Sequence, residues 1–95
     1  MPSNQVSPLN TLQQLMCITM EECGELTQRC SKMMRKFNTI EEATPEQLTL
    51  LTEEAGDVMC MLQLMMEHGV LNDEEMRDRV NVKMTKLKKW SNLIT

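Results

Sequence analysis

A five-residue pattern of the form Glu-Glu-x-Gly-acid occurs twice in this chain, at residues 21–25 and 53–57. Each copy lies in a long stretch without proline, in which apolar residues recur at the three- and four-residue intervals of an α-helix. Within each copy, two acidic residues stand three positions apart, which places both carboxylates on one helix face, about one turn apart. Two such helices side by side would direct four carboxylates into one small volume. These four residues are Glu22, Glu25, Glu54 and Asp57.

Four carboxylates at such close range repel one another strongly unless a divalent cation lies among them, and Mg²⁺ and Mn²⁺ prefer oxygen ligands. The repeated pattern therefore predicts a helical metal site for Mg²⁺, with Mn²⁺ as the alternative ion. A solvated acidic face is the usual explanation of a single acidic pair at helical spacing. The duplication, the matched glycines and the interruption of apolar rows by the acids favour the metal site over that explanation.

The rows of apolar residues give the expected packing of the two helices. In both, the paired acids stand in a row that begins apolar, where a carboxylate costs free energy unless a cation or hydrogen bonds compensate it. Gly24 and Gly56 each cost about 1 kcal/mol relative to alanine inside a helix, which suggests that the backbone approaches something closely there. Cys23 and Cys30 fall in the expected packed row of the first helix, where small buried thiols are common. That row consists of Leu9, Leu12, Met16, Thr19, Cys23, Leu26, Cys30, Met33 and Phe37.

Length and charge exclude several classes of protein. The 95 residues are enough for one domain with one core, predicted to span residues 1–95. The net charge of −4 and the near absence of aromatic residues argue against binding of a nucleic-acid polymer. With a single histidine and no Cys-x-x-Cys pair, a zinc site is not expected. The chain shows neither a signal peptide nor a membrane-spanning stretch, so we expect a soluble, cytoplasmic protein with reduced thiols and no membrane partner.

Capping residues predict three main helices after a flexible tail at residues 1–7. Ser7-Pro8 predicts a helix start at residue 8, and this helix should end at Arg35 or Phe37. Thr44-Pro45 predicts a second helix that ends at His68-Gly69, and Asn72 with Glu75 predicts a third that continues to about Asn92. The expected fold is an all-α, antiparallel bundle of these helices. Because three helices make a thin bundle, a second copy of the chain should complete the core as a homodimer or homotetramer.

The acidic pattern resembles the motif of the all-α nucleoside triphosphate pyrophosphohydrolases, the superfamily that includes MazG proteins, dimeric dUTPases, dCTPases and phosphoribosyl-ATP pyrophosphohydrolases. The match consists of Glu22-x-x-Glu25, a gap of 28 residues, and Glu54-x-x-Asp57. It extends to Asn81-Val82-Lys83, which is similar to the Asn-x-Lys of a later helix in MazG domains. MazG proteins often have arginine after this motif, whereas this chain has Lys86.

The resemblance implies an oligomeric helical bundle that hydrolyses a nucleoside triphosphate, NTP or dNTP, to the monophosphate and pyrophosphate. It also implies Mg²⁺ bound by the four acidic residues. A carboxylate that the metal does not fully engage, Glu25 or Glu22 with Glu21 as a further alternative, would accept the proton of the attacking water. Asn81, Lys83 and Lys86 would then bind the substrate. Arg29 and Lys32 follow Glu25 along the same helix row, so they would either join the substrate site or lie in solvent. The alternatives to the leading function are a base-selective relative acting on dUTP or dCTP, and a non-catalytic helical interaction module that retains an acidic metal site.

Overall fold

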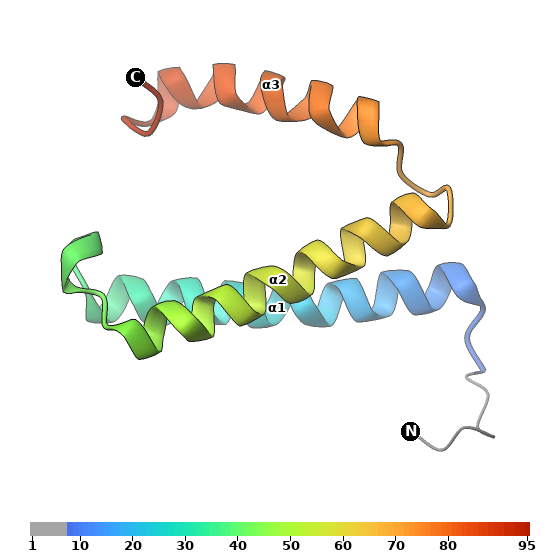
Figure 1. Cartoon of the computed structure of the whole chain (residues 1–95), viewed down its shortest axis with the longest axis horizontal. Coiled ribbons are helices and arrows are strands. Elements are labelled where there is room, and N and C mark those ends of the chain that lie inside the picture. The colour runs from blue at the N-terminus through green and yellow to red at the C-terminus, as the bar shows by residue number, and fades with distance from the viewer. Residues whose placement is uncertain (1–7) are drawn as a thin grey trace. The chain divides into compact units, whose positions relative to one another are not determined.

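The computed structural model of the chain describes residues 8–95, which form three α-helices and one short 3₁₀ helix, with no β-strand among them. These elements are α1 (Thr11–Lys36), η1 (Ile40–Glu42), α2 (Pro45–Glu67) and α3 (Asp73–Trp90) (Figure 1). The prediction of an all-α chain with three main helices is therefore confirmed. The predicted flexible tail at residues 1–7 lies outside the described residues.

The start of α1 differs from its prediction. The helix begins at Thr11 and not at Pro8, because Asn10 and Gln13 form a capping box. Asn10 Oδ1 accepts a hydrogen bond from the Gln13 backbone N–H at 2.8 Å, and Gln13 Oε1 accepts one from the Asn10 backbone N–H at 3.0 Å. This reciprocal pair satisfies two backbone donors, whereas the signal at Ser7-Pro8 offers a cap and a fixed φ angle. At the other end, α1 stops at Lys36 with Phe37 as its C-cap, as predicted.

The other predicted caps are present. Thr44 Oγ1 accepts a hydrogen bond from the Gln47 N–H at 3.3 Å where α2 begins. After α2, Gly69 adopts a φ angle of 74°, and the Val70 N–H donates to the Met65 carbonyl at 2.8 Å. A positive φ at this position favours glycine, which explains why the chain leaves α2 after Glu67 through a turn at Gly69. Asn72 caps α3 through the Glu75 N–H at 2.9 Å, and α3 ends at Trp90, two residues before the predicted Asn92.

The chain divides into two compact units, the first ending at Leu64 and the second beginning at Met65. In the first unit, α1 and α2 run side by side in opposite directions, and the segment with η1 joins them (Figure 1). An ion pair between Arg29 on α1 and Glu54 on α2 crosses this pair of helices. The second unit contains the end of α2, the turn at Gly69 and α3.

The packed row of α1 differs by about one position from the row expected from the sequence. Cys23 and Cys30, predicted to be buried, are exposed. The less exposed positions instead combine residues of the expected row with Leu15, Glu22 and Arg29 from the neighbouring row that carries the acidic residues, so the side of the helix that is shielded from solvent lies between the two rows. Both Glu22 and Arg29 belong to this shielded side of the helix. Positions on this side include Leu15, Thr19, Glu22, Leu26, Arg29, Met33 and Phe37, and Gln14, Met16, Cys17 and Ser31 are also only partly exposed.

Within the described chain, Gly24 and Gly56 make no close backbone contact with another element. A Cβ atom added to either glycine would meet nothing within 4 Å outside its own helix. Neither residue has a positive φ angle, which among the described glycines is confined to Gly69. Within a single copy of this chain, alanine at either position would therefore have room.

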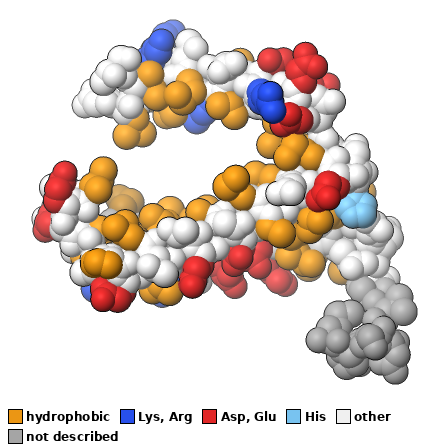
Figure 2. Space-filling model, viewed as in Figure 1, with side chains coloured by type: hydrophobic (Ala, Val, Ile, Leu, Met, Phe, Trp, Pro, Cys, Tyr) orange, Lys and Arg blue, Asp and Glu red, His pale blue; other side chains and the backbone are white. Residues whose placement is uncertain are grey.

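The hydrophobic core is small for the number of apolar residues. Among the described residues, the buried hydrophobic side chains are Leu15, Met61 and Met65. Many large apolar side chains are exposed instead, and Figure 2 shows hydrophobic side chains on the surface of both units. Within residues 8–95, no helix combines the length and the apolar character that crossing a membrane requires.

Candidate metal centre

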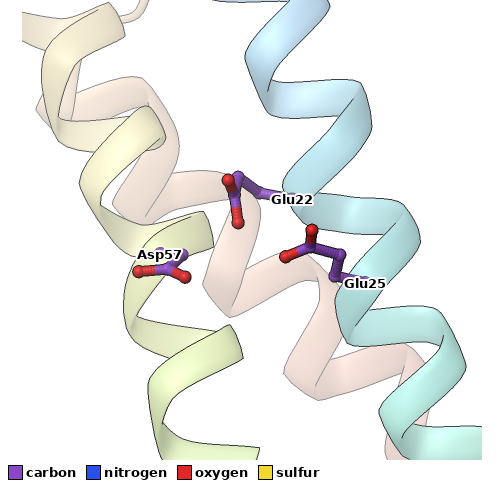
Figure 3. Close-up of side chains that lie close together, drawn as sticks. All are labelled: Glu22, Glu25 and Asp57. Atoms are coloured by element: carbon purple, nitrogen blue, oxygen red, sulfur yellow. The ribbon is translucent and has the colours of Figure 1, made fainter. Parts of the chain in front are cut away.

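Three of the four predicted ligands come together where α1 passes α2. Glu22 and Glu25 on α1 and Asp57 on α2 each contribute a carboxylate oxygen, and these oxygens lie within 4.8 Å of one another. Figure 3 shows the three side chains pointing toward the space between the two helices. The three-residue spacing on α1 provides two neighbouring carboxylates, and the antiparallel course of α2 brings the third. The repeated sequence pattern thus contained all three members of this cluster, together with Glu54, which is not among them.

Burial differs among the three side chains. Glu22 lies on the partly shielded side of α1, whereas Glu25 and Asp57 are exposed. The Glu22 Oε2 atom is itself buried and has no hydrogen-bond partner among the described residues. A buried carboxylate oxygen without a partner costs free energy, because it has lost water and gained nothing in exchange. The cluster therefore has an unsatisfied inner oxygen and an outer side open to solvent.

The environment raises the pKa of Glu22 above its ordinary value. Burial of the carboxyl is the largest cause, followed by the negative charges of Glu25 and Asp57. The negative charge of Glu21 acts in the same direction. All of these effects disfavour the ionised form of Glu22. A cation among the three carboxylates would reverse this preference and stabilise the ionised form.

The three carboxylates fit a hard divalent cation by their chemistry. They supply oxygen atoms alone, the ligand type that Mg²⁺ prefers. Glu22 Oε2 is the one buried side-chain oxygen or nitrogen without a hydrogen-bond partner among the described, non-exposed residues, and it belongs to this cluster. Because Mg²⁺ usually keeps several water molecules and binds through a few carboxylates plus phosphate oxygens, a cluster open on one side suits it.

Glu54, the fourth predicted ligand, is engaged elsewhere. Arg29 Nε donates to Glu54 Oε2 at 3.1 Å, and Arg29 Nη2 donates to Glu54 Oε1 at 3.3 Å. Arg29 Nη1 donates to Gln47 Oε1 at 3.3 Å. The Arg29 and Glu54 side chains are only 13% and 20% exposed, so the ion pair is shielded from solvent. The structure therefore joins three of the predicted carboxylates and pairs the fourth with an arginine.

Sequence spacing carried a partial signal for this ion pair. Arg29 stands four positions after Glu25, on the row that the acids occupy, so its presence on the same side of α1 could be expected. Its partner, Glu54, could not be predicted, because spacing within one helix does not specify which residues of the second helix lie opposite. The interpretation of Arg29 as a free surface cation does not hold in the described chain.

The remaining predicted site residues are exposed to solvent. Lys32 lies on α1, and it lines an open pocket together with Arg29. Asn81, Lys83 and Lys86 lie on α3, in the second unit. Their predicted role in substrate binding stays a prediction.

No protein-family model, curated protein or solved structure matches this chain.

The raised pKa of Glu22 makes the stability of the metal-free protein depend on pH. At pH values between the pKa of Glu22 in the unfolded chain and its higher pKa in the folded chain, the folded chain binds more protons than the unfolded chain. The free energy of unfolding therefore falls as the pH rises through the folded-state pKa. Glu22→Gln removes this titration and supplies an amide that can donate hydrogen bonds to Glu25 and Asp57. In EDTA, we expect the variant to have a higher Tm than the parent at about pH 8 and a similar Tm at about pH 4.

Thermal unfolding followed by circular dichroism across this pH range measures the effect. Glu53→Gln removes the same charge from an exposed residue outside the cluster and serves as the control. If Glu22→Gln and Glu53→Gln raise the Tm equally at every pH, the effect is one of net charge, and the special environment of Glu22 is refuted.

Proposed function

We propose that this chain is a Mg²⁺-dependent nucleoside triphosphate pyrophosphohydrolase of the MazG-like all-α superfamily, with Mn²⁺ as the alternative ion. The observation that carries the proposal is the meeting of Glu22, Glu25 and Asp57 within 4.8 Å, in helices whose sequence contains the doubled acidic motif. Its substrate would be an NTP or dNTP, converted by water to the monophosphate and pyrophosphate. Selectivity for dUTP or dCTP is a narrower form of the same proposal.

The protein's own groups have distinct roles in this reaction. Mg²⁺, when bound by the three carboxylates, would supply charge neutralisation at the phosphate oxygens. Glu22 is a suitable proton acceptor for the attacking water, because it belongs to the carboxylate cluster and its Oε2 atom has no hydrogen-bond partner among the described residues. Glu25, exposed at the outer side of the cluster, is the alternative acceptor. Asn81, Lys83 and Lys86 are proposed to hold the substrate through charge-assisted and polar hydrogen bonds.

Self-association is part of the proposal, since the described chain buries few of its apolar side chains. Only three hydrophobic residues within residues 8–95 are buried, while Ile18, Met20 and Met59 in the first unit are 41%, 68% and 70% exposed. A helical bundle normally covers such residues with a neighbouring helix. A second copy of this chain, packed into a helical bundle, would provide that cover.

Sedimentation velocity at micromolar concentration should give a mass at least twice the 11.0 kDa of one chain. Replacing two exposed apolar residues, Met20→Glu and Met59→Glu, should shift the protein toward the single-chain mass, because charged groups resist burial in an interface. A parent protein that sediments as a single chain at all concentrations would refute the proposed assembly.

Pyrophosphate release from a panel of NTPs and dNTPs, with and without Mg²⁺, tests the proposed reaction. The expected result is release of monophosphate and pyrophosphate in equal amounts, abolished by EDTA. A chain that binds Mg²⁺ but hydrolyses no nucleotide in the panel would be the non-catalytic interaction module instead. A chain active on dUTP or dCTP alone would be the base-selective relative.

A further inference from the structure

Basic residues gather in two acid-free segments of an otherwise acidic chain, residues 26–40 and residues 79–95. The chain has a net charge of −4, but residues 26–40 contain no aspartate or glutamate. Four of the ten lysines and arginines of the chain lie in residues 26–40. They are Arg29, Lys32, Arg35 and Lys36.

The same four side chains line one open pocket of about 400 Å³, together with Gln47 from α2. Lys32 and Arg35 also line an adjoining hollow that adds the polar side chains of Thr27, Gln28 and Ser31. Arg35 Nη1 donates to Ser31 Oγ at 2.7 Å, which directs its guanidinium along the helix surface. The pocket therefore offers several hydrogen-bond donors in a region of positive charge.

Most of this charge has no anionic partner within the described chain. Arg29 is neutralised by Glu54, but Lys32, Arg35 and Lys36 form no ion pair with a described carboxylate. Arg29 uses three of its N–H groups on Glu54 and Gln47, which leaves two of the five guanidinium hydrogens free to donate. Arg35 and Lys36 lie in the last turn of α1, where they also offset the helix dipole. Lys32 lies outside that turn, so the dipole alone does not account for the cluster.

The pocket adjoins the carboxylate cluster along α1. Arg29 follows Glu25 by four residues and Lys32 follows it by seven, on one side of the helix. At 1.5 Å per residue, these separations correspond to about 6 Å and about 10 Å along the helix axis. A chain of phosphates that starts at the carboxylate cluster and runs toward the C-terminus of α1 would thus meet successive cations.

We propose that this basic pocket binds a phosphate chain, and specifically that it holds the pyrophosphate portion of the substrate and product. The inference deepens the proposed function and, as to the substrate, rests on it. Its chemical basis is separate, however: unpaired lysine and arginine side chains favour multiply charged phosphate oxygens, to which arginine can donate two hydrogen bonds at once. Pyrophosphate binding should accordingly occur without any divalent cation and should weaken with added salt.

The test titrates the full-length, EDTA-treated protein with inorganic pyrophosphate at low ionic strength, by isothermal calorimetry. Single substitutions Lys32→Gln, Arg35→Gln and Lys36→Gln should each weaken binding about two- to fivefold, as expected for partly solvated charge contacts. The triple variant should weaken it about tenfold or more. Circular dichroism of each variant verifies that the helices remain folded.

The matched control removes two lysines and one arginine from α3, through Arg79→Gln, Lys88→Gln and Lys89→Gln, all at exposed positions. This control should retain pyrophosphate binding within about twofold of the parent. Equal losses in the two triple variants would show a diffuse effect of net charge, and absence of binding to the parent would remove the site altogether.

The two proposals fail in different ways. If no nucleotide is hydrolysed but pyrophosphate binding is lost in the α1 triple variant alone, the phosphate pocket stands and the enzymatic function falls. If nucleotides are hydrolysed and the α1 triple variant keeps the parent KM and pyrophosphate affinity, the function stands and the pocket falls.

Discussion

Asp57→Asn should reduce nucleoside triphosphate hydrolysis by about 10²- to 10³-fold while leaving the helices folded. Asp57 is the single carboxylate that α2 contributes to the cluster with Glu22 and Glu25. Replacing it by an amide removes one negative charge of a three-carboxylate site and should weaken Mg²⁺ binding along with turnover. The magnitude corresponds to loss of one preorganised electrostatic contact in a catalytic site. Pyrophosphate release at saturating Mg²⁺ measures the rate, and calorimetry with Mg²⁺ measures binding.

Glu67→Gln provides the control for this prediction. Glu67 is exposed near the end of α2 and lies outside the cluster, so its substitution makes the same change in net charge. We expect this variant to keep the parent rate within about twofold, in line with other exposed surface changes. Parent activity in both Asp57→Asn and Glu54→Ala would disprove the assignment of the acidic motif to catalysis.

Local features of the fold were readable from the sequence because they depend on neighbouring residues. Thr44-Pro45 and Asn72 with Glu75 set the starts of α2 and α3, and Gly69 ends α2 with a positive φ angle. The start of α1 was missed because two capping signals compete within a few residues. The box formed by Asn10 and Gln13 prevailed in the structure.

Features that depend on the fit between helices could be predicted only in part. The three-residue spacing placed Glu22 and Glu25 on one face of α1, but the rotation of α1 against α2 was misjudged by about one position. The actual rotation leaves Cys23 exposed, where burial was predicted, and shields Arg29 from solvent. The packed row of α1 contains a carboxylate and an arginine beside its apolar residues. A prediction from hydrophobic periodicity places only apolar residues in a packed row, so it misses an ion pair there.

The ion pair of Glu54 with Arg29 also depends on how the two helices fit together, so the sequence did not predict it. The sequence indicated two equivalent acidic pairs, whereas the structure gives them different partners. Asp57 meets the carboxylates of α1, and Glu54, one turn earlier on α2, meets the guanidinium of Arg29. Equal motifs on two helices become unequal because the antiparallel arrangement sets each turn of α2 against a different turn of α1. The four-carboxylate site predicted from the sequence thus separates into a three-carboxylate cluster and an adjoining ion pair.

Arg29→Met should destabilise the metal-free protein by about 2 kcal/mol. The substitution keeps an unbranched apolar side chain but leaves Glu54, which is 20% exposed, without its bidentate partner and Gln47 without a donor. Removal of one partner from a fully buried ion pair costs about 3–5 kcal/mol, and the remaining solvent contact of this pair reduces that figure. Urea unfolding in EDTA measures the change in the free energy of unfolding. Arg35→Met, at an exposed position without a carboxylate partner, should cost less than about 1 kcal/mol.

A double-mutant cycle with Glu54→Gln separates the ion pair from other effects of these substitutions. The double variant should recover most of the loss, with a coupling energy of about 1–2 kcal/mol between the two positions. Mg²⁺ should also stabilise Arg29→Met more than it stabilises the parent, because Glu54 stands one helical turn from Asp57 and is released to approach the cation. Equal stabilisation by Mg²⁺ in both proteins would contradict this role for Glu54 and confine it to the ion pair with Arg29.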